Sequence, residues 1–358
     1  MVVPMVACAL AGTPAASAHG VPDQVNDPPT GTSYGCGFPG SPLFQGFLPS
    51  RRQLAALELR LRAGGSIPAG GVSFPVRIRR GSPTGEVLGE ATATVPAPNP
   101  LGATWLAHVD FIQPLVLEPE GTFVIEGPSL PDNIVTWMGT EFGTSPTYPG
   151  GTAFTCGGSA VPAFDLNFAT FTPVDGSPPE TSISKSPAEG SLTQARAARF
   201  DFAGTDDLSY ASKLRFTCSL DGSPGTLCTS PYTSSGLSDG THVFTVQASD
   251  EAGKADASPA TLSWKVDATP PHQPSVRGPH RTRTARPLFV FTASDTIDPA
   301  STLRFLCSLD SQPLRTCGRS LRPLLRDGPH LLRVAALDRA GNRSAVILFR
   351  ILRLSSKK

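Results

Sequence analysis

The residues best suited to covalent chemistry are cysteines that recur at a fixed spacing. Two pairs lie ten residues apart, and each pair follows the same Phe-x-Cys-Ser-Leu-Asp segment. Without Cys8, which falls in a leader-like segment, six cysteines remain, and six cysteines can pair in many ways. The repeated spacing makes two local disulfides the simplest choice and leaves one long-range pair. We therefore predict the disulfides Cys218–Cys228, Cys307–Cys317 and Cys36–Cys156.

Side chains that could act in catalysis do not form a convincing centre, and we predict that the protein is not an enzyme. Ser33 lies in a Gly-x-Ser-x-Gly motif, but the strand before it and the helix after it that a nucleophile elbow requires are both missing. The six histidines include no pair at metal-ligand spacing. His242 and His330 recur at matching positions of a repeat, so we expect them to bond a turn.

Acidic residues could also bind a metal ion. Asp206 and Asp250 fall in Asp-containing turns that recur in the second copy of the repeat, and Ca²⁺ prefers several carboxylate oxygens. No segment matches a known calcium loop, and aspartate is also a common turn residue. We predict no cofactor and retain Ca²⁺ at Asp206 or Asp250 as the alternative to a turn-forming role.

Charge is distributed unevenly, although the formal net charge is only +1. Residues 272–358 contain 16 Lys and Arg against 5 Asp and Glu, so the C-terminal part is strongly basic. Such a surface could bind an acidic polymer, and a cell-wall polymer fits an exported protein better than nucleic acid does. The alternative is an arginine-rich surface without a dedicated ligand. The candidate polyanion-binding residues are Arg281, Arg283, Arg286, Arg319, Arg322 and Arg326.

Aromatic residues in the N-terminal part could form a face that stacks on sugars. Trp137, Tyr148 and Phe142 lie among Gly, Pro and Thr, which places them on or near loops. Trp105 alternates with apolar residues and is expected in the core, the usual place for large aromatic side chains. A glycan is therefore a candidate partner.

The elements that position these residues are predicted to be strands. Short alternating apolar and polar runs, broken by Gly, Pro, Ser and Asp, dominate the chain and are typical of all-β proteins. The run from His242 to Ala248 alternates in this way. Asp-x-Ala-Gly segments ending at Gly253 and Gly341 are expected to form tight turns between strands.

Residues 1–18 resemble a signal peptide, with an apolar stretch and an Ala-x-Ala cleavage signal. Residues 34–172 form one predicted unit. Matching linkers, Asp175-Gly-Ser-Pro-Pro and Asp267-Ala-Thr-Pro-Pro, divide the remainder into repeats at 173–267 and 268–358. No apolar run after the leader is long enough for a membrane span.

Residues 173–358 resemble the bacterial Ig-like tandem repeats of secreted and cell-surface proteins. The shared features are the Phe-x-Cys-Ser-Leu-Asp strand, the nearby second cysteine, the Gly-x-His turn and the Asp-x-Ala-Gly ending. The resemblance implies two Ig-like β-sandwiches. The N-terminal unit more loosely resembles a jelly-roll or carbohydrate-binding sandwich, so the expected fold is a jelly-roll-like sandwich followed by two Ig-like sandwiches.

These observations together predict an extracellular, secreted protein, associated with the cell surface through a partner or through its basic repeat. Its predicted role is non-catalytic adhesion or display, with the N-terminal sandwich as the binding module and the repeats as a spacer. The alternative is an accessory carbohydrate-binding protein of polysaccharide degradation, and a third reading is a hydrolase with its site in the N-terminal unit. The sequence does not predict the oligomeric state.

Overall fold

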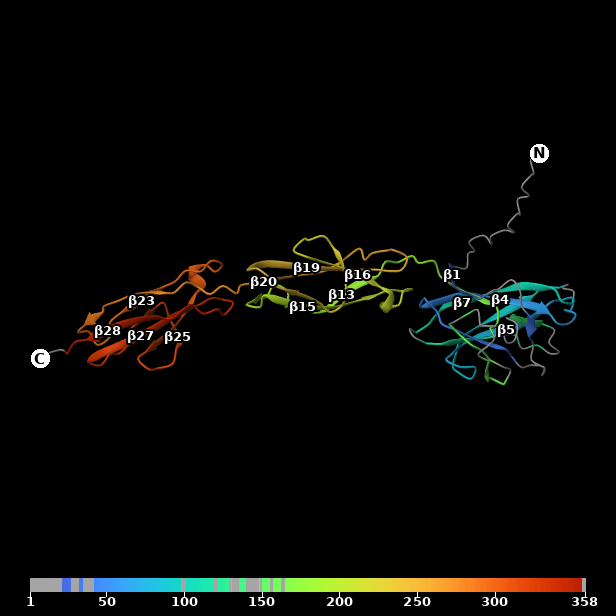
Figure 1. Ribbon diagram of the computed structural model, residues 1–358, viewed down its shortest axis with the longest axis horizontal. Coiled ribbons are helices and arrows are strands. Elements are labelled where there is room, and N and C mark those ends of the chain that lie inside the picture. The colour runs from blue at the N-terminus through green and yellow to red at the C-terminus, as the bar shows by residue number, and fades with distance from the viewer. Residues whose placement is uncertain are drawn as a thin grey trace, which may run out of the picture. The chain divides into compact units, whose positions relative to one another are not determined.

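The structure is a computed structural model, and its elements are labelled in Figure 1. It describes residues 21–26, 32–34, 42–97, 101–118, 121–128, 130, 135–139, 148, 150–154, 157–161 and 165–355. Within these residues the chain is all-β apart from short 3-10 turns, as the sequence predicts. No helix among them is long and apolar enough to cross a membrane.

The N-terminal sandwich consists of two six-stranded sheets. One sheet contains β1 (Val21–Asn26), β12 (Phe168–Thr172), β4 (Gln53–Ala63), β9 (Val135–Gly139) and β2 (Thr32–Tyr34), with β7 (Thr104–Val116) paired to β4. The other runs β11 (Ala160–Val161), β10 (Ala153–Phe154), β3 (Phe44–Phe47), β8 (Phe123–Glu126), β5 (Val72–Arg80) and β6 (Val87–Val95).

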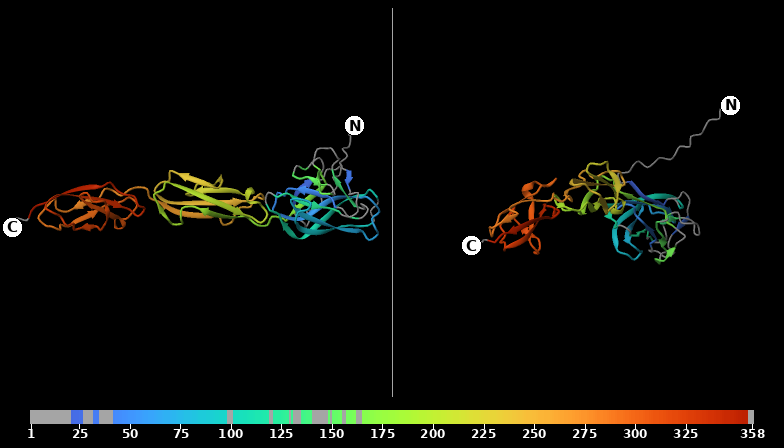
Figure 2. Two further views of the ribbon diagram at one scale, coloured as in Figure 1. Left: turned by 90° about the horizontal axis from the view of Figure 1, so that it is seen from below. Right: turned by 60° about the vertical axis from the view of Figure 1, so that its left-hand side comes forward.

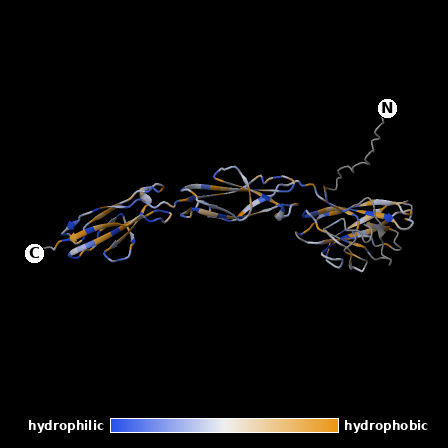
Figure 3. Cartoon of the chain, viewed as in Figure 1, coloured by the Kyte–Doolittle hydropathy of each residue, from blue (hydrophilic) through white to orange (hydrophobic). Residues whose placement is uncertain are grey.

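Alternation along the strands builds the core of this sandwich. Leu57, Leu59 and Leu61 of β4 and Val76 and Ile78 of β5 are completely buried and belong to one hydrophobic cluster. Every second residue of a strand points to the same face, so the two sheets meet through these side chains. Figure 3 shows the resulting mixture of hydrophobic and hydrophilic residues along the strands.

The first repeat is an Ig-like sandwich of a three-stranded and a five-stranded sheet. The smaller sheet contains β13 (Glu180–Lys185), β15 (Ala197–Thr205) and β18 (Tyr232–Ser235). The larger runs β14 (Leu192–Thr193), β20 (Ala260–Val266), β19 (Gly240–Ser249), β16 (Arg215–Leu220) and β17 (Thr226–Cys228). The 3-10 turn η2 (Ala211–Lys213) precedes β16.

The second repeat has the same two sheets in the same order. The smaller sheet contains β21 (Ser275–Arg277), β23 (Phe289–Thr292) and β26 (Ser320–Leu321). The larger runs β22 (Arg281–Thr282), β28 (Ile347–Arg353), β27 (Gly328–Leu337), β24 (Arg304–Leu309) and β25 (Arg315–Cys317). The turn η3 (Ala300–Thr302) precedes β24. Figures 1 and 2 show the two layers within each sandwich.

By its internal contacts the chain divides into two compact units, which are described separately. The first runs to Pro179 and also includes Thr205–Leu214 and Ser249–Ala255; the second contains Glu180–Gly204, Arg215–Ala248 and the chain from Asp256 onward. Each repeat nevertheless has its own hydrophobic cluster, centred on Phe200 and Phe244 in the first and on Phe289 and Phe305 in the second. The domain boundaries at 172/173 and 267/268 remain predictions.

Candidate functional site

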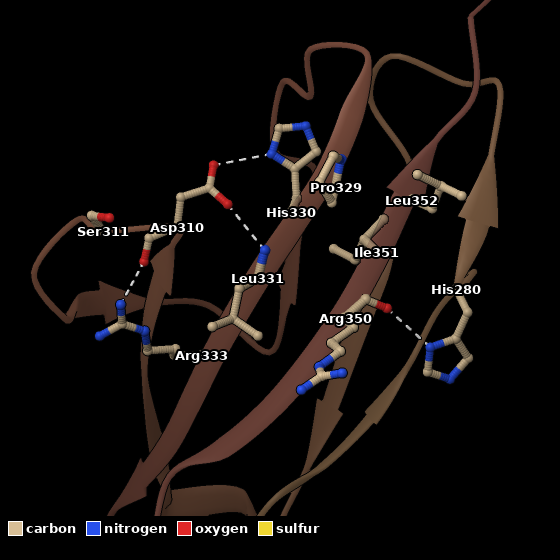
Figure 4. A pocket seen from close by; sticks show the side chains of 10 residues that line it. All are labelled: His280, Asp310, Ser311, Pro329, His330, Leu331, Arg333, Arg350, Ile351 and Leu352. Atoms are coloured by element: carbon tan, nitrogen blue, oxygen red, sulfur yellow. Dashed lines mark hydrogen bonds and ion pairs between the residues drawn. The ribbon is translucent and has the colours of Figure 1, made fainter.

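An open groove of about 750 Å³ lies on the larger sheet of the second repeat. Neighbouring strands β27 and β28 form its floor, where Pro329 is paired with Leu352 and Leu331 with Arg350. Residues two apart on a strand point to the same face, so these apolar and basic side chains share the groove (Figure 4). The groove therefore presents an apolar strip flanked by positive charge.

A histidine–aspartate pair forms one end of the groove. The His330 Nδ1 lies 3.0 Å from Asp310 Oδ2, and His330 Nε2 lies 2.8 Å from the Arg326 carbonyl oxygen. The Leu331 amide donates to Asp310 Oδ1 at 3.0 Å, and Arg333 donates to the Asp310 carbonyl at 2.7 Å (Figure 4). At the other side, His280 Nδ1 lies 3.0 Å from the Arg350 carbonyl oxygen.

These hydrogen bonds shift the pKa values of both His330 and Asp310. The bond to the Arg326 carbonyl raises the pKa of His330 above its ordinary value of 6.5, burial opposes the rise, and Asp310 reinforces it. Burial acts to raise the pKa of Asp310, but the bonds from His330 and the Leu331 amide outweigh it and leave that pKa below its ordinary value. The pair thus favours imidazolium beside carboxylate.

The same histidine–aspartate pair occurs in the first repeat, as the repeated histidines predict. His242 Nδ1 lies 2.8 Å from Asp221 Oδ2, and its Nε2 lies 2.8 Å from the Ser238 carbonyl oxygen. Asp221 and Asp310 both have φ of 54°, a left-handed conformation that Asp tolerates better than most residues. The prediction that the histidines bond a turn is confirmed. In both repeats these contacts join a strand to a neighbouring turn and so stabilise the fold.

All six arginines of the predicted polyanion site are exposed. A backbone hydrogen bond of 2.9 Å from the Leu325 amide to the Ala285 carbonyl places their two segments, 281–286 and 319–326, side by side. Arg319 also makes contacts within the repeat. Its guanidinium donates to the Ala300 carbonyl and lies 5.8 Å from the Phe305 ring centre. The structure therefore brings the predicted basic residues onto neighbouring segments.

None of these six arginines lines the groove, whose basic side chains are Arg333, Arg350 and the two histidines. The sequence argument missed Arg333 and Arg350 because they lie in regular strands rather than in a cluster of basic residues. The signal that could have identified them is their alternation with apolar residues along β27 and β28, where Arg333 is half-buried and Arg350 is exposed.

Burial contradicts the prediction of an exposed stacking face at two aromatic residues. Trp137 is fully buried and its indole N–H donates to the Asn167 carbonyl at 2.7 Å. Tyr148 is 5 % exposed and packs edge-on against Phe168 at 5.2 Å. Both rings belong to the core because it supplies their apolar and polar contacts. Phe142 lies outside the described residues.

The two local disulfides are confirmed. Cys218 is bonded to Cys228 and Cys307 to Cys317. Each joins neighbouring strands of one sheet, since Phe216 is paired with Cys228 and Phe305 with Cys317. The predicted Cys36–Cys156 bond and the signal peptide lie outside the described residues.

The two calcium candidates make the turn contacts that the alternative reading predicts. Asp206 Oδ1 accepts the amides of Leu208 and Ser209, and Asp250 Oδ1 accepts the Lys254 amide at 2.8 Å. Among the described residues, no group of three or more His, Cys, Asp or Glu side chains is already arranged to hold a metal ion.

No family model and no curated protein sequence matches the chain. Among solved structures, fibronectin(III)-like modules of CbhA from Clostridium thermocellum are 18% identical, with a TM-score of 0.30, covering 49% of this chain and 95% of theirs. The chicken CNTN1 FN1-FN3 domains are 10% identical, with a TM-score of 0.27, covering 82% of this chain and 97% of theirs. Similarity at this level carries no inference about function.

Proposed function

We propose that the protein is an exported, non-catalytic adhesion or display protein whose C-terminal repeat binds an acidic cell-surface polymer. The exposed arginines on the two adjacent segments 281–286 and 319–326 are the observation that carries this proposal. The groove adds Arg333 and Arg350 on the larger sheet of the same repeat. The first repeat and the N-terminal sandwich act as the displayed part.

Compact sandwiches with local disulfides suit this role. Disulfides persist mainly in oxidising environments, and each of these closes a short loop within one sheet. Trp137 and Tyr148 are buried, so neither offers a face for sugar stacking, which weakens the support for the carbohydrate-binding alternative. The basic surface thus has the stronger structural support as the attachment site.

The test is binding of the full chain to immobilised poly(glycerol phosphate), with neutral dextran as the comparison surface. We expect binding to the phosphate polymer alone and a steep loss as salt rises, because exposed charges are screened within about 10 Å at 0.1 M salt. The double variant Arg283→Glu/Arg322→Glu should bind roughly tenfold more weakly, since electrostatic complementarity is reversed at two exposed positions.

The matched control reverses two exposed charges on the first repeat, in the variant Lys213→Glu/Arg199→Glu. A general effect of net charge would weaken both variants equally and would refute a dedicated surface on the second repeat. Equal binding to dextran, or binding that salt does not change, would refute the proposed acidic ligand.

A further inference from the structure

The sheet face that carries the groove differs between the two repeats, although its strand pairing is the same. His242 lies opposite Trp264 in the first repeat, and His330 lies opposite Ile351 in the second. Counted from these pairs, the face presents Thr241, Val243, Thr245, Ser263 and Lys265 in the first repeat and Pro329, Leu331, Arg333, Arg350 and Leu352 in the second. The fold therefore does not require the apolar and basic side chains of the groove.

The apolar side chains form a continuous strip along the groove. Pro329 lies opposite Leu352, and Leu331 follows on the same face of β27. At the usual rise of a strand, the face from Pro329 to Arg333 spans roughly 13 Å. Grooves of this size, about 750 Å³, commonly hold small ligands with an apolar body.

The positive charge of the groove has no internal counterion. Within the described residues, no hydrogen bond or ion pair engages the exposed Arg350 guanidinium. Asp310 is the only acid among the described residues that line the groove, and its carboxylate already bonds His330 and the Leu331 amide. A ligand that complements this surface must therefore bring a negative charge.

The first repeat carries a carboxylate of its own at the corresponding place. Glu189 accepts the Ser263 amide at 2.9 Å and the Ser263 hydroxyl at 2.7 Å. The amides of Lys265 and Leu352 donate to Ser191 and His280, so these acceptors correspond, and two residues earlier Gly278 stands in the place of Glu189. The second repeat thus replaces Ser263 by Arg350 and lacks the acid beside it.

Two guanidinium groups can reach one anion in the groove. Arg350 lies opposite Leu331, and Arg333 is two residues further along the same face of β27. Such diagonal neighbours are about 7–8 Å apart, which long side chains can bridge. Figure 4 shows Leu331 between the two arginines, with one nitrogen of Arg333 held by the Asp310 carbonyl at 2.7 Å.

We propose that the groove binds a single amphiphile with one anionic group. Its alkyl chain lies along Pro329, Leu331 and Leu352. Its phosphate or carboxylate lies between Arg333 and Arg350, because a planar guanidinium matches both anions. The concave shape of the groove favours one chain over the flat surface of a bilayer. This site is separate from the arginines of segments 281–286 and 319–326, so it goes beyond the polymer-binding function proposed above.

Titration of the full chain with octyl phosphate below its micelle concentration, followed by amide NMR, tests the proposal. We expect saturable shifts in β27 and β28 with a dissociation constant of roughly 0.1–1 mM, the strength of small ligands of ordinary efficiency. Butyl phosphate keeps the anion and shortens the chain, and octyl glucoside keeps the chain and removes the charge. Each should bind at least about tenfold more weakly, since each loses one of the two contributions.

Arg350→Ser installs the residue of the first repeat at the same place, so we expect the variant to fold, and it should bind octyl phosphate roughly tenfold more weakly. Leu331→Thr should weaken binding roughly fivefold through lost apolar contact. The matched control is Arg283→Glu/Arg322→Glu, which should keep octyl phosphate binding while losing poly(glycerol phosphate). Arg350→Ser should show the opposite pattern, so the two proposals fail separately.

The absence of saturable shifts with octyl phosphate overturns the proposal, as does equal binding of octyl phosphate and butyl phosphate. Binding only to vesicles that contain phosphatidylglycerol, and not to monomeric octyl phosphate, would assign the face to a bilayer instead. Unchanged affinity of an Arg350→Ser variant that is folded by circular dichroism also overturns it. If that variant does not fold, the three probes on the wild-type chain decide the matter.

Discussion

The paired Asp310 and His330 offer a way to separate backbone strain from hydrogen bonding at one residue. Asp310 has a φ of 54°, and its carboxylate bonds both His330 and the Leu331 amide. Asn tolerates this conformation and Ala does not. Asp310→Asn therefore removes the charge and one of the two acceptor oxygens but keeps the backbone conformation, while Asp310→Ala removes both hydrogen bonds and adds backbone strain.

The magnitudes follow from these contacts. Charge-assisted hydrogen bonds contribute about 1.5–3 kcal/mol when desolvated, but the Asp310 side chain is 46% exposed, so solvent screening reduces their combined loss in Asp310→Asn to about 1 kcal/mol. A left-handed non-glycine residue costs about 1–2 kcal/mol more, which gives about 2–3 kcal/mol for Asp310→Ala. A domain of this size loses about 4–8 °C in melting temperature per kcal/mol.

Calorimetric unfolding of the full chain measures these effects on the transition of the second repeat, and histidine NMR measures the pKa of His330. Because the folded pKa of His330 is raised, its stabilisation is fully present below the ordinary value of 6.5 and is lost as pH rises through the folded pKa. Asp310→Asn should flatten this pH dependence. Equal melting temperatures for the Asn and Ala variants would refute the strain argument, and an unchanged His330 pKa would refute the charge argument.

Three further changes test the packing. Removing the disulfide in Cys218→Ser/Cys228→Ser should destabilise the first repeat by about 2–3 kcal/mol through loop entropy; a loss below about 0.5 kcal/mol in urea unfolding would contradict this. Phe200→Ala deletes a fully buried ring stacked 3.9 Å from Phe244 and should cost about 3–5 kcal/mol in the same assay, whereas a near-neutral result would mean that the core repacks. Trp137→Phe should cost about 1–3 kcal/mol, because it removes the donor to a buried carbonyl; an unchanged unfolding midpoint, followed by circular dichroism, would show that this bond contributes nothing.

The repeated features of the sequence predicted the fold best. Comparison of the two copies identified the Cys218–Cys228 and Cys307–Cys317 bonds, because a short recurrent spacing restricts cysteines to neighbouring strands. The turn glycines Gly253 and Gly341 have φ of 87° and 96°, as a tight turn between strands requires. Such local features depend on few residues, so sequence spacing is sufficient to predict them.

Features that depend on strand register could not be predicted in this way. Asp221 was visible in the repeated motif, but its bond to His242 requires the pairing that places β16 beside β19. Trp137 was expected near a loop because Gly, Pro and Thr occur in the surrounding sequence, yet its side chain belongs to the hydrophobic core of the N-terminal sandwich. The correspondence of Lys254 and Asn342 likewise depends on tertiary contacts, because each side chain donates to the carbonyl of its own linker aspartate, Asp175 or Asp267.

The position of the disulfides at the margin of each sheet also bears on aggregation. β17 and β25 are outermost strands of three residues each, and the disulfides Cys218–Cys228 and Cys307–Cys317 attach them to the longer strands β16 and β24. If the bond is reduced, the short strand can detach and leave the backbone groups of β16 or β24 unpaired, which is the usual template for pairing with another molecule. The disulfides therefore hold the edge strands in place and prevent the exposed edges of β16 and β24 from pairing with another molecule. Reduced protein should form intermolecular sheets more readily than oxidised protein.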